Sequence, residues 1–193
     1  MVRSGLIILS LCFFGLLQAQ EKNATYSSFA IDHKEVIWVQ VYHAQQPEDS
    51  LSDHVFKFLK RKAWIKDLHY DGDEIVADIQ NYRVDYKRYG GKYINTSNLI
   101  RTARWSGKVR VSFKDGKYRA VVYGIEYDAR QPAMHAGKMN NQPHMIHGTW
   151  TDWVLNSYRT DFRKKRHNNM DIMHFNLKDS FTLKETELID EDW

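Results

Sequence analysis

The dipeptide Asp115–Gly116, which lies between two runs of alternating apolar and polar residues, constrains the fold more than any other feature of the sequence. Asp-Gly is typical of the two-residue turn that joins neighbouring antiparallel strands. If Lys114 pairs with Lys117, the register of the hairpin is fixed and the apolar residues of both runs share one face. That face carries three cross-strand pairs, which are Phe113 with Tyr118, Val111 with Ala120, and Val109 with Val122. The sequence therefore predicts an antiparallel hairpin over residues 105–128 with one buried face.

Three further segments have the composition of strands. Residues 35–43 are rich in β-branched and aromatic side chains that alternate between two faces. Residues 64–70 and 74–82 flank the turn sequence Asp71-Gly72-Asp73, which predicts two strands joined by a tight turn. Together with the hairpin, these segments predict five strands in one antiparallel sheet.

Two segments have apolar residues at helical spacing. The first predicted helix begins at Ser50, whose hydroxyl is expected to cap it. The second begins at Thr149 and ends in the basic stretch 163–166, because cations suit the C-terminus of a helix. Residues 87–101 and 129–148 predict long loops. The order strand, helix, four strands, helix predicts an α+β fold in which two helices pack on an antiparallel sheet.

The beginning of the chain is typical of a secretory signal. Arg3 is followed by an apolar run at residues 5–17 and by the small residue Ala19. The run is shorter than the about 20 apolar residues that a transmembrane helix needs. We therefore expect cleavage after Ala19 and no transmembrane span in the mature chain. A lipoprotein signal modified at Cys12 is the alternative, against which the bulky neighbour Leu11 argues.

Cleavage would divide the chain into three parts. These are a signal peptide at 1–19, an α+β domain at 20–169, and a partly mobile C-terminal extension at 170–193, of which residues 170–183 fit either a strand or a helix. The one cysteine, Cys12, lies in the signal, so the mature chain would have no disulfide and no thiolate ligand. The formal net charge of +4 is too small to indicate a nucleic-acid partner.

Four segments carry a family resemblance. They are Gln-Ala-Gln at 18–20, the helix that leads to Trp64, Gly-Lys-Val-Arg-Val-Ser-Phe-Lys-Asp-Gly-Lys-Tyr-Arg at 107–119, and Ile-Glu-Tyr at 125–127. They resemble a family of unknown function in exported proteins of Bacteroidota, with a fold like that of the TATA-box-binding protein. The resemblance implies this fold and brings no catalytic residue with it. The two long loops depart from the short links of the family, and the fold alone does not imply DNA binding.

Basic and aromatic residues form a candidate binding strip on and before the hairpin. Its members are Arg101, Arg104, Trp105, Lys108, Arg110 and Arg119. On an exposed sheet face, such a strip could hold an anionic glycan, a lipid headgroup or an acidic peptide, with the Trp105 ring as a stacking surface. The simpler interpretation is a solvated strand face with ordinary lysines and arginines.

Histidines gather in the second predicted loop. His135, His144 and His147 could bind a transition metal if a carboxylate such as Asp152 joined them. The helical His-Glu-x-x-His pattern is absent, and exposed loop histidines are the simpler interpretation. The sequence therefore predicts no cofactor.

These observations leave three functional hypotheses. The leading one is a non-enzymatic binding or structural domain in the periplasm or cell envelope, whose partner is an unknown envelope protein or an anionic glycan. It rests on the predicted export and on the lack of a catalytic sequence motif. The alternatives are a metal-assisted hydrolase that uses the three histidines and an anionic-glycan binder that uses the strip.

Overall fold

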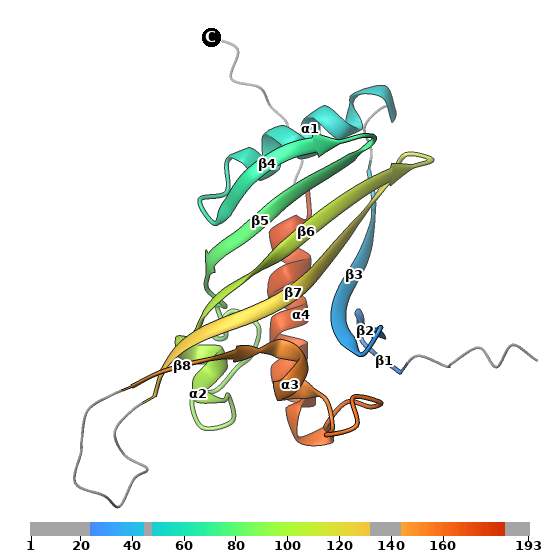
Figure 1. Ribbon diagram of the computed structural model, residues 1–193. Helices are drawn as coiled ribbons and strands as arrows, with labels where there is room; N and C mark the ends of the chain where they lie inside the picture. Colours follow the sequence, from blue (N-terminus) through green and yellow to red (C-terminus); the bar gives the residue numbers. More distant parts are fainter. Residues whose placement is uncertain (1–23, 45–47, 132–143, 184–193) are drawn as a thin grey trace, which may run out of the picture.

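The computed structural model describes residues 24–44, 48–131 and 144–183 (Figure 1). The elements, in chain order, are β1 (Thr25–Tyr26), β2 (Phe29–Asp32), β3 (Glu35–His43), α1 (Glu48–Lys60), β4 (Ile65–Asp71), β5 (Glu74–Tyr82), α2 (Asn98–Thr102), β6 (Arg104–Lys114), β7 (Lys117–Gln131), β8 (His144–Thr149), α3 (Trp150–Val154) and α4 (His167–Phe181). The predicted signal at 1–19 lies outside the described residues. The structure confirms the predicted class, an antiparallel α+β fold.

The long strand β7 organises the sheet. The sheet order is β1-β2-β3-β7-β6-β5-β4, and every pair is antiparallel. Residues 117–122 of β7 pair with β3, whereas residues 126–131 pair with β8. Gly124, with φ of 58°, lies at the break between these halves, in the left-handed region that glycine tolerates. The two halves of β7 thus pair, on the side away from β6, with two different strands that lie far apart in the sequence.

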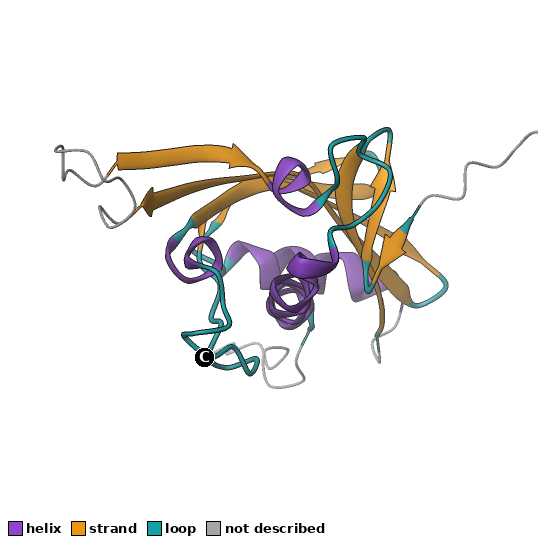
Figure 2. Ribbon diagram, turned by 90° about the horizontal axis from the view of Figure 1, so that it is seen from below, coloured by secondary structure: helices purple, strands orange, loops and turns teal. Residues whose placement is uncertain are grey.

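The long helix α4 lies against one face of the sheet, across its centre (Figures 1 and 2). Hydrogen bonds tie α4 to the strands beneath it. The Trp38 indole N–H donates to Nδ1 of His174 at 3.2 Å, and the Tyr118 hydroxyl donates to the Phe181 carbonyl at 2.6 Å. The buried apolar side chains of α4 are Met170, Ile172, Met173, Leu177 and Phe181. The helix is therefore part of the core.

The predicted hairpin is confirmed together with its register. Lys114 lies opposite Lys117, and the three apolar pairs behind them match as predicted. The predicted strands at 35–43, 64–70 and 74–82 correspond to β3, β4 and β5 to within one residue at each end. In the β4–β5 and β6–β7 hairpins, the turn residues and the apolar alternation predict the same strand pairing, and the structure has that pairing.

Both predicted helices need correction. α1 begins at Glu48, so Ser50 lies inside its first turn and the predicted cap is wrong. Thr149 does cap α3, because its hydroxyl oxygen accepts a hydrogen bond from the Asp152 N–H at 3.1 Å. However, α3 ends at Val154, and the helix predicted to continue to residues 163–166 is wrong in length.

Asn156 explains why the chain turns back after α3. Its side-chain oxygen accepts a hydrogen bond from the Thr160 N–H at 3.0 Å, and its own N–H donates to the Asp161 carbonyl at 2.9 Å. An asparagine that bonds the nearby backbone competes with a continuing helix and favours a turn. The reversal brings Leu155 opposite Phe162 in an isolated bridge.

The two predicted long loops are shorter than expected. The first, at 87–101, ends in α2. The second, at 129–148, holds the end of β7 and all of β8 except its last residue, and its middle at 132–143 lies outside the described residues. The strands β1 and β2 were not predicted. In the described part of the chain, no helix is both long and apolar enough to cross a lipid bilayer.

The segment 170–183, which the sequence left open, forms most of α4. The predicted domain boundary at residue 169 therefore falls inside a helix of the core. The ambiguity arises because the polar residues Asn169, His174 and Asn176 occupy buried positions on α4 and interrupt the apolar pattern. The last ten residues, 184–193, lie outside the described part.

The buried His174 predicts a dependence of stability on pH. Burial lowers the pKa of His174 below its ordinary value of 6.5, nearby Lys178 lowers it further, and Asp171 raises it. The unfolded chain binds the proton at the ordinary pKa, and the folded chain binds it only at lower pH. The contribution of His174 to the free energy of unfolding is therefore complete above about pH 6.5. This contribution is lost as the pH falls through the lowered pKa of His174 in the folded protein.

The measurement is the melting temperature of the wild-type protein and of His174→Gln between about pH 7 and about pH 5. We expect the wild type to lose more stability over this range, because the glutamine variant has no proton to bind at this position. Their difference isolates His174 from the other titrating groups. Parallel curves for the two proteins would contradict the prediction.

Candidate functional site

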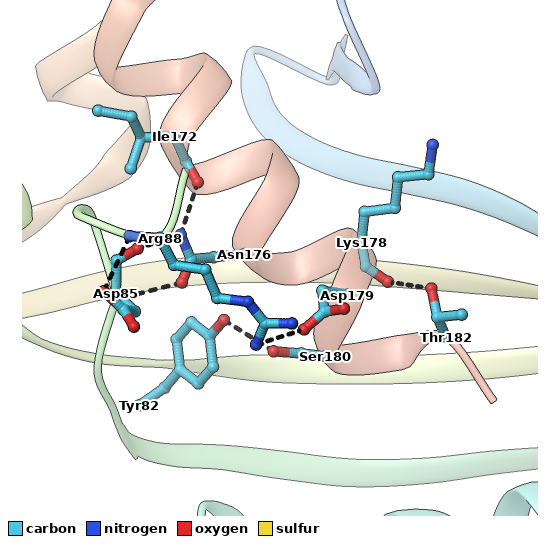
Figure 3. Close-up of polar contacts among 9 residues, drawn as sticks. All are labelled: Tyr82, Asp85, Arg88, Ile172, Asn176, Lys178, Asp179, Ser180 and Thr182. Carbon is cyan, nitrogen blue, oxygen red and sulfur yellow. Dashed lines mark hydrogen bonds and ion pairs between the residues drawn. The ribbon is translucent and has the colours of Figure 1, made fainter. Parts of the chain in front are cut away.

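A cleft of about 570 Å³ opens where the end of β5 and the start of β4 meet the C-terminal half of α4. A volume of this size suits a small ligand. Three separate segments line it, and its residues are Ala63, Trp64, Lys66, Gln80, Asn81, Tyr82, Arg83, Asp85, Arg88, Tyr89, Asn176, Asp179 and Ser180. Figure 3 shows part of this wall, with side chains from α4 and from the segment after β5 facing one another.

Asn176 fixes the segment after β5 against α4. Its side-chain oxygen accepts a hydrogen bond from the Asp85 N–H at 2.8 Å, and its amide nitrogen donates to the Ile172 carbonyl at 2.8 Å (Figure 3). A buried amide with both ends satisfied is a rigid connection. The wall of the cleft therefore has a defined shape before any ligand arrives.

The acidic groups of the cleft are occupied by the protein itself. The Arg88 guanidinium lies 3.1 Å from a carboxylate oxygen of Asp179 (Figure 3). Burial and then a hydrogen bond to Asp179 raise the pKa of Tyr89 to about 12, so its hydroxyl stays protonated. The carboxylate of Asp85 accepts the backbone N–H of Arg88 at 3.2 Å. Asp179 is thus paired with a cation, whereas Asp85 is exposed and accepts a backbone N–H.

Beneath these groups, Tyr82 closes the floor of the cleft. Its hydroxyl lies 2.9 Å from the Ser180 hydroxyl, and burial raises the pKa of Tyr82 above its ordinary range. The Trp64 ring meets the Tyr82 ring edge-on, with 4.9 Å between the centroids. Because Trp64 is only half-buried, part of its indole remains open to the cleft.

The mouth of the cleft carries polar side chains that reach solvent. Lys66, Gln80, Asn81 and Arg83 are all exposed. Within the described residues, neither Lys66 nor Arg83 forms an ion pair. The cleft therefore presents two cations and two amides around a partly open indole.

The predicted binding strip is only partly assembled. Arg104, Lys108 and Arg110 on β6 are exposed, as is Arg119 on β7. Trp105, in contrast, is 2% exposed and faces the core, so it cannot stack on a ligand at the surface.

The cations of the strip already have neighbours. Lys108 lies 3.8 Å from Asp78, and Arg110 lies 3.2 Å from Glu74, in both cases across the β5–β6 pair. The Arg104 guanidinium donates to the side-chain oxygen of Asn81 at 3.2 Å. Arg101 belongs to α2, where it stacks over the Tyr93 ring at 3.7 Å. The charge of the strip is thus partly cancelled by acids on the same sheet.

The three predicted metal ligands are not brought together in the described residues. His135 lies outside them, as does the side chain of His144. His147 is exposed, with Nδ1 at 2.8 Å from Asp128, and this hydrogen bond raises its pKa above the ordinary value. Asp152 binds Thr149 and Arg159 instead of a histidine. Within the described part of the chain, no three His, Cys, Asp or Glu residues form a group able to hold a metal ion.

Sequence reasoning did not find the cleft. Its lining comes from residues 63–66, 80–89 and 176–180, and α4 was not expected to reach the sheet. The one signal in the sequence was a group of polar and aromatic residues from Gln80 to Tyr89. This group begins at the end of the predicted strand 74–82, whose apolar residues alternate clearly. Without the position of α4, that group is indistinguishable from an ordinary loop.

Comparison with known proteins concerns the fold. The sequence matches no family model and no curated protein. A TBP-like protein from Parabacteroides distasonis is similar in structure, with a TM-score of 0.46 and 9% identity over 78% of this chain and 90% of that chain. A DUF4468 family protein from Bacteroides ovatus has a TM-score of 0.40 and 13% identity over 80% of this chain and 91% of that chain. At these TM-scores and identities, neither similarity carries a family or a function over to this chain.

Proposed function

We propose that this chain is an exported envelope domain that binds a small ligand in the cleft between β5 and α4 and performs no chemistry on it. One observation carries the proposal, namely a cleft of about 570 Å³ whose wall is fixed by internal hydrogen bonds and whose mouth carries exposed polar groups. Shape that exists before binding lowers the entropy cost of holding a ligand.

The pairing of the Asp179 carboxylate with Arg88 supports binding over hydrolysis. A general base needs an accessible lone pair and a pKa near the working pH. In the cleft, Asp179 is neutralised by Arg88, and the high pKa of Tyr89 keeps its hydroxyl from acting as a base. These groups shape and polarise the wall, which suits recognition.

The test uses a variant that fills the cleft. Gln80 is exposed and lines the mouth, so Gln80→Trp should occupy the cleft without disturbing the core. The measurement is the change in backbone amide NMR signals when neutral sugars, acidic sugars and short peptides are added. We expect at least one of these probes to shift signals of the cleft residues in the wild type and not in Gln80→Trp.

The matched control is Lys117→Trp, which places the same ring at the exposed tip of the β6–β7 hairpin. This variant should bind as the wild type does. Signal changes confined to the open sheet face around Arg110 and Arg119 would assign binding to the strip and overturn the proposal. Absence of any change at the cleft residues would overturn it too.

Export is the second part of the proposal, and it is supported by the basic, apolar and small-residue pattern of residues 1–19. The prediction is that protein recovered from the envelope of an expressing bacterium begins at Gln20. N-terminal sequencing measures this directly. Ala19→Arg should block processing, whereas Cys12→Ser should leave it unchanged. A mature chain that begins with an acylated Cys12, or an intact Met1, would contradict the prediction.

A further inference from the structure

We infer that the ligand of the cleft is an acidic saccharide, that is, a sugar ring that carries a carboxylate. This inference rests on the proposed function and adds the chemical class of the ligand. Three features of the cleft lead to it: the charge that remains after internal pairing, the position of the free donors, and the open ring surface.

The first feature is a surplus of positive charge. The lining holds three cations, Lys66, Arg83 and Arg88, and two acids, Asp85 and Asp179. The ion pair of Arg88 with Asp179 removes one charge of each sign. Asp85 is exposed and turns a carboxylate oxygen toward the backbone N–H of Arg88. Asp85 keeps its negative charge, so the lining has a net charge of +1, and the two cations at the mouth favour an anion.

The second feature is the kind of donor that these cations offer. Arg83 presents a planar fork that matches a carboxylate with two parallel hydrogen bonds. Lys66 adds a flexible point charge from the neighbouring strand β4. Gln80 on β5 supplies an amide that can donate to and accept from hydroxyls, and the neighbouring Asn81 adds an amide N–H donor, since Arg104 already bonds its side-chain oxygen. Hydroxyls beside a carboxylate are the polar groups of an acidic sugar.

The third feature is the half-buried indole of Trp64. An aromatic face next to polar side chains gives the apolar side of a sugar ring a surface to stack on. Trp64 shares the lining with Ala63, Tyr82 and Tyr89, and the other lining residues are polar or charged, so aromatic surface lies directly beside hydrogen-bonding groups. A free inorganic anion would use the cations and leave the indole without a role. An acidic sugar uses the cations, the amides and the ring together.

The experiment compares tetragalacturonate with its fully methyl-esterified form, which keeps the sugar rings and removes the charges. Binding is followed by titration of the ¹⁵N-labelled protein, with the amide signals of the cleft residues and the indole N–H signal of Trp64 as readouts. We expect tetragalacturonate to shift these signals and the ester to bind about tenfold more weakly or not at all, since a charged hydrogen bond contributes about 1.5–3 kcal/mol.

Two charge variants locate the contact. Arg83→Gln and Lys66→Gln remove exposed cations that form no ion pair with the described residues, so both proteins should fold. The double variant should raise the Kd for tetragalacturonate about tenfold. Lys117→Gln removes one charge at the hairpin tip and should leave the Kd unchanged. Arg119→Gln should also leave it unchanged, and a rise there would move the site to the sheet face and overturn the inference.

The outcomes separate this inference from the proposed function. If the methyl ester or neutral maltotetraose shifts the cleft signals as strongly as tetragalacturonate, the acidic class is wrong and a binding cleft remains. If only short peptides shift those signals, the saccharide class is wrong and a binding cleft again remains. If no probe shifts them, both proposals fall.

Discussion

Deletion of residues 167–193 is expected to abolish the cooperative folding of this protein. The deletion removes α4, whose five buried apolar side chains each contribute about 1.5–3 kcal/mol. Their sum is comparable with the whole stability of an ordinary domain, about 5–15 kcal/mol. The deletion also leaves the Trp38 indole N–H and the Tyr118 hydroxyl without their partners on α4. Both losses act against the folded state.

The measurement is near-ultraviolet circular dichroism with a urea titration, which reports fixed aromatic packing and its cooperative loss. A chain that ends at Leu183 is the control, because it retains all of α4. The control should keep a sigmoidal transition, and the chain that ends at Arg166 should show none. A cooperative transition in the shorter chain would mean that residues 24–166 form a core of their own.

Trp150→Ala is expected to cost about 3–5 kcal/mol of unfolding free energy. Trp150 is fully buried at the start of α3, and its ring contacts Phe29, Trp105 and Trp153 at centroid distances of 5.7, 5.3 and 5.2 Å. Truncation leaves a cavity lined by three rings from three elements. The surrounding residues cannot collapse into this cavity, because a different strand or helix holds each of the three rings in place.

Trp150→Phe sharpens this prediction. The Trp150 indole N–H is buried with no hydrogen-bond partner in the described residues, so phenylalanine removes an unpaired donor while it keeps a ring. We expect its cost to be clearly smaller, about 1–2 kcal/mol. Tyr158→Ala is the surface control, since Tyr158 is 81% exposed, and it should change stability by less than about 0.5 kcal/mol. Equal costs for all three variants in urea titrations would contradict the packing described for Trp150.

The β-sheet could be predicted from the sequence wherever two independent signals agreed. At Asp115–Gly116 the turn residues require left-handed backbone, and both residues have positive φ, at 51° and 69°. The alternation on either side then sets the register without further information. The same agreement at Gly72 gave the β4–β5 pair. β1 and β2 are too short for alternation to show, so no pattern indicated them.

The helices were less predictable because side chains decided where they end. Asn156 redirects the chain after α3 through bonds to the backbone, which helical spacing alone does not reveal. α4 carries three buried polar residues whose partners lie far away in the sequence, such as Asn169 with the Ser97 N–H. Its preceding residue, Arg166, makes no side-chain cap. The usual signals for the start of a helix are therefore missing.

The candidate site could not be predicted for the same reason. The cleft exists only because α4 reaches across to the end of β5, so the pairing of Arg88 with Asp179 joins two segments that no local spacing connects. The predicted strip failed at Trp105 because this residue has the same parity on β6 as Val109 and Val111 and therefore shares their buried face. The composition of the strip suggested a common surface, whereas the alternation of the strand separates the indole from the cations.

The pairing of β3 with β7 has a consequence for the order in which the chain can fold as it is made. Trp38 pairs with Val122, so β3 leaves the ribosome long before its inner neighbour exists. Until then its inner edge offers unpaired backbone groups beside alternating valines and aromatic rings, a surface on which other chains can add strands. A hairpin such as β6–β7 needs only local contacts and can close early. Because the chain is synthesised from the N-terminus, β3 waits for β7 with one edge unpaired. We therefore expect β3 to be a segment that a chaperone protects.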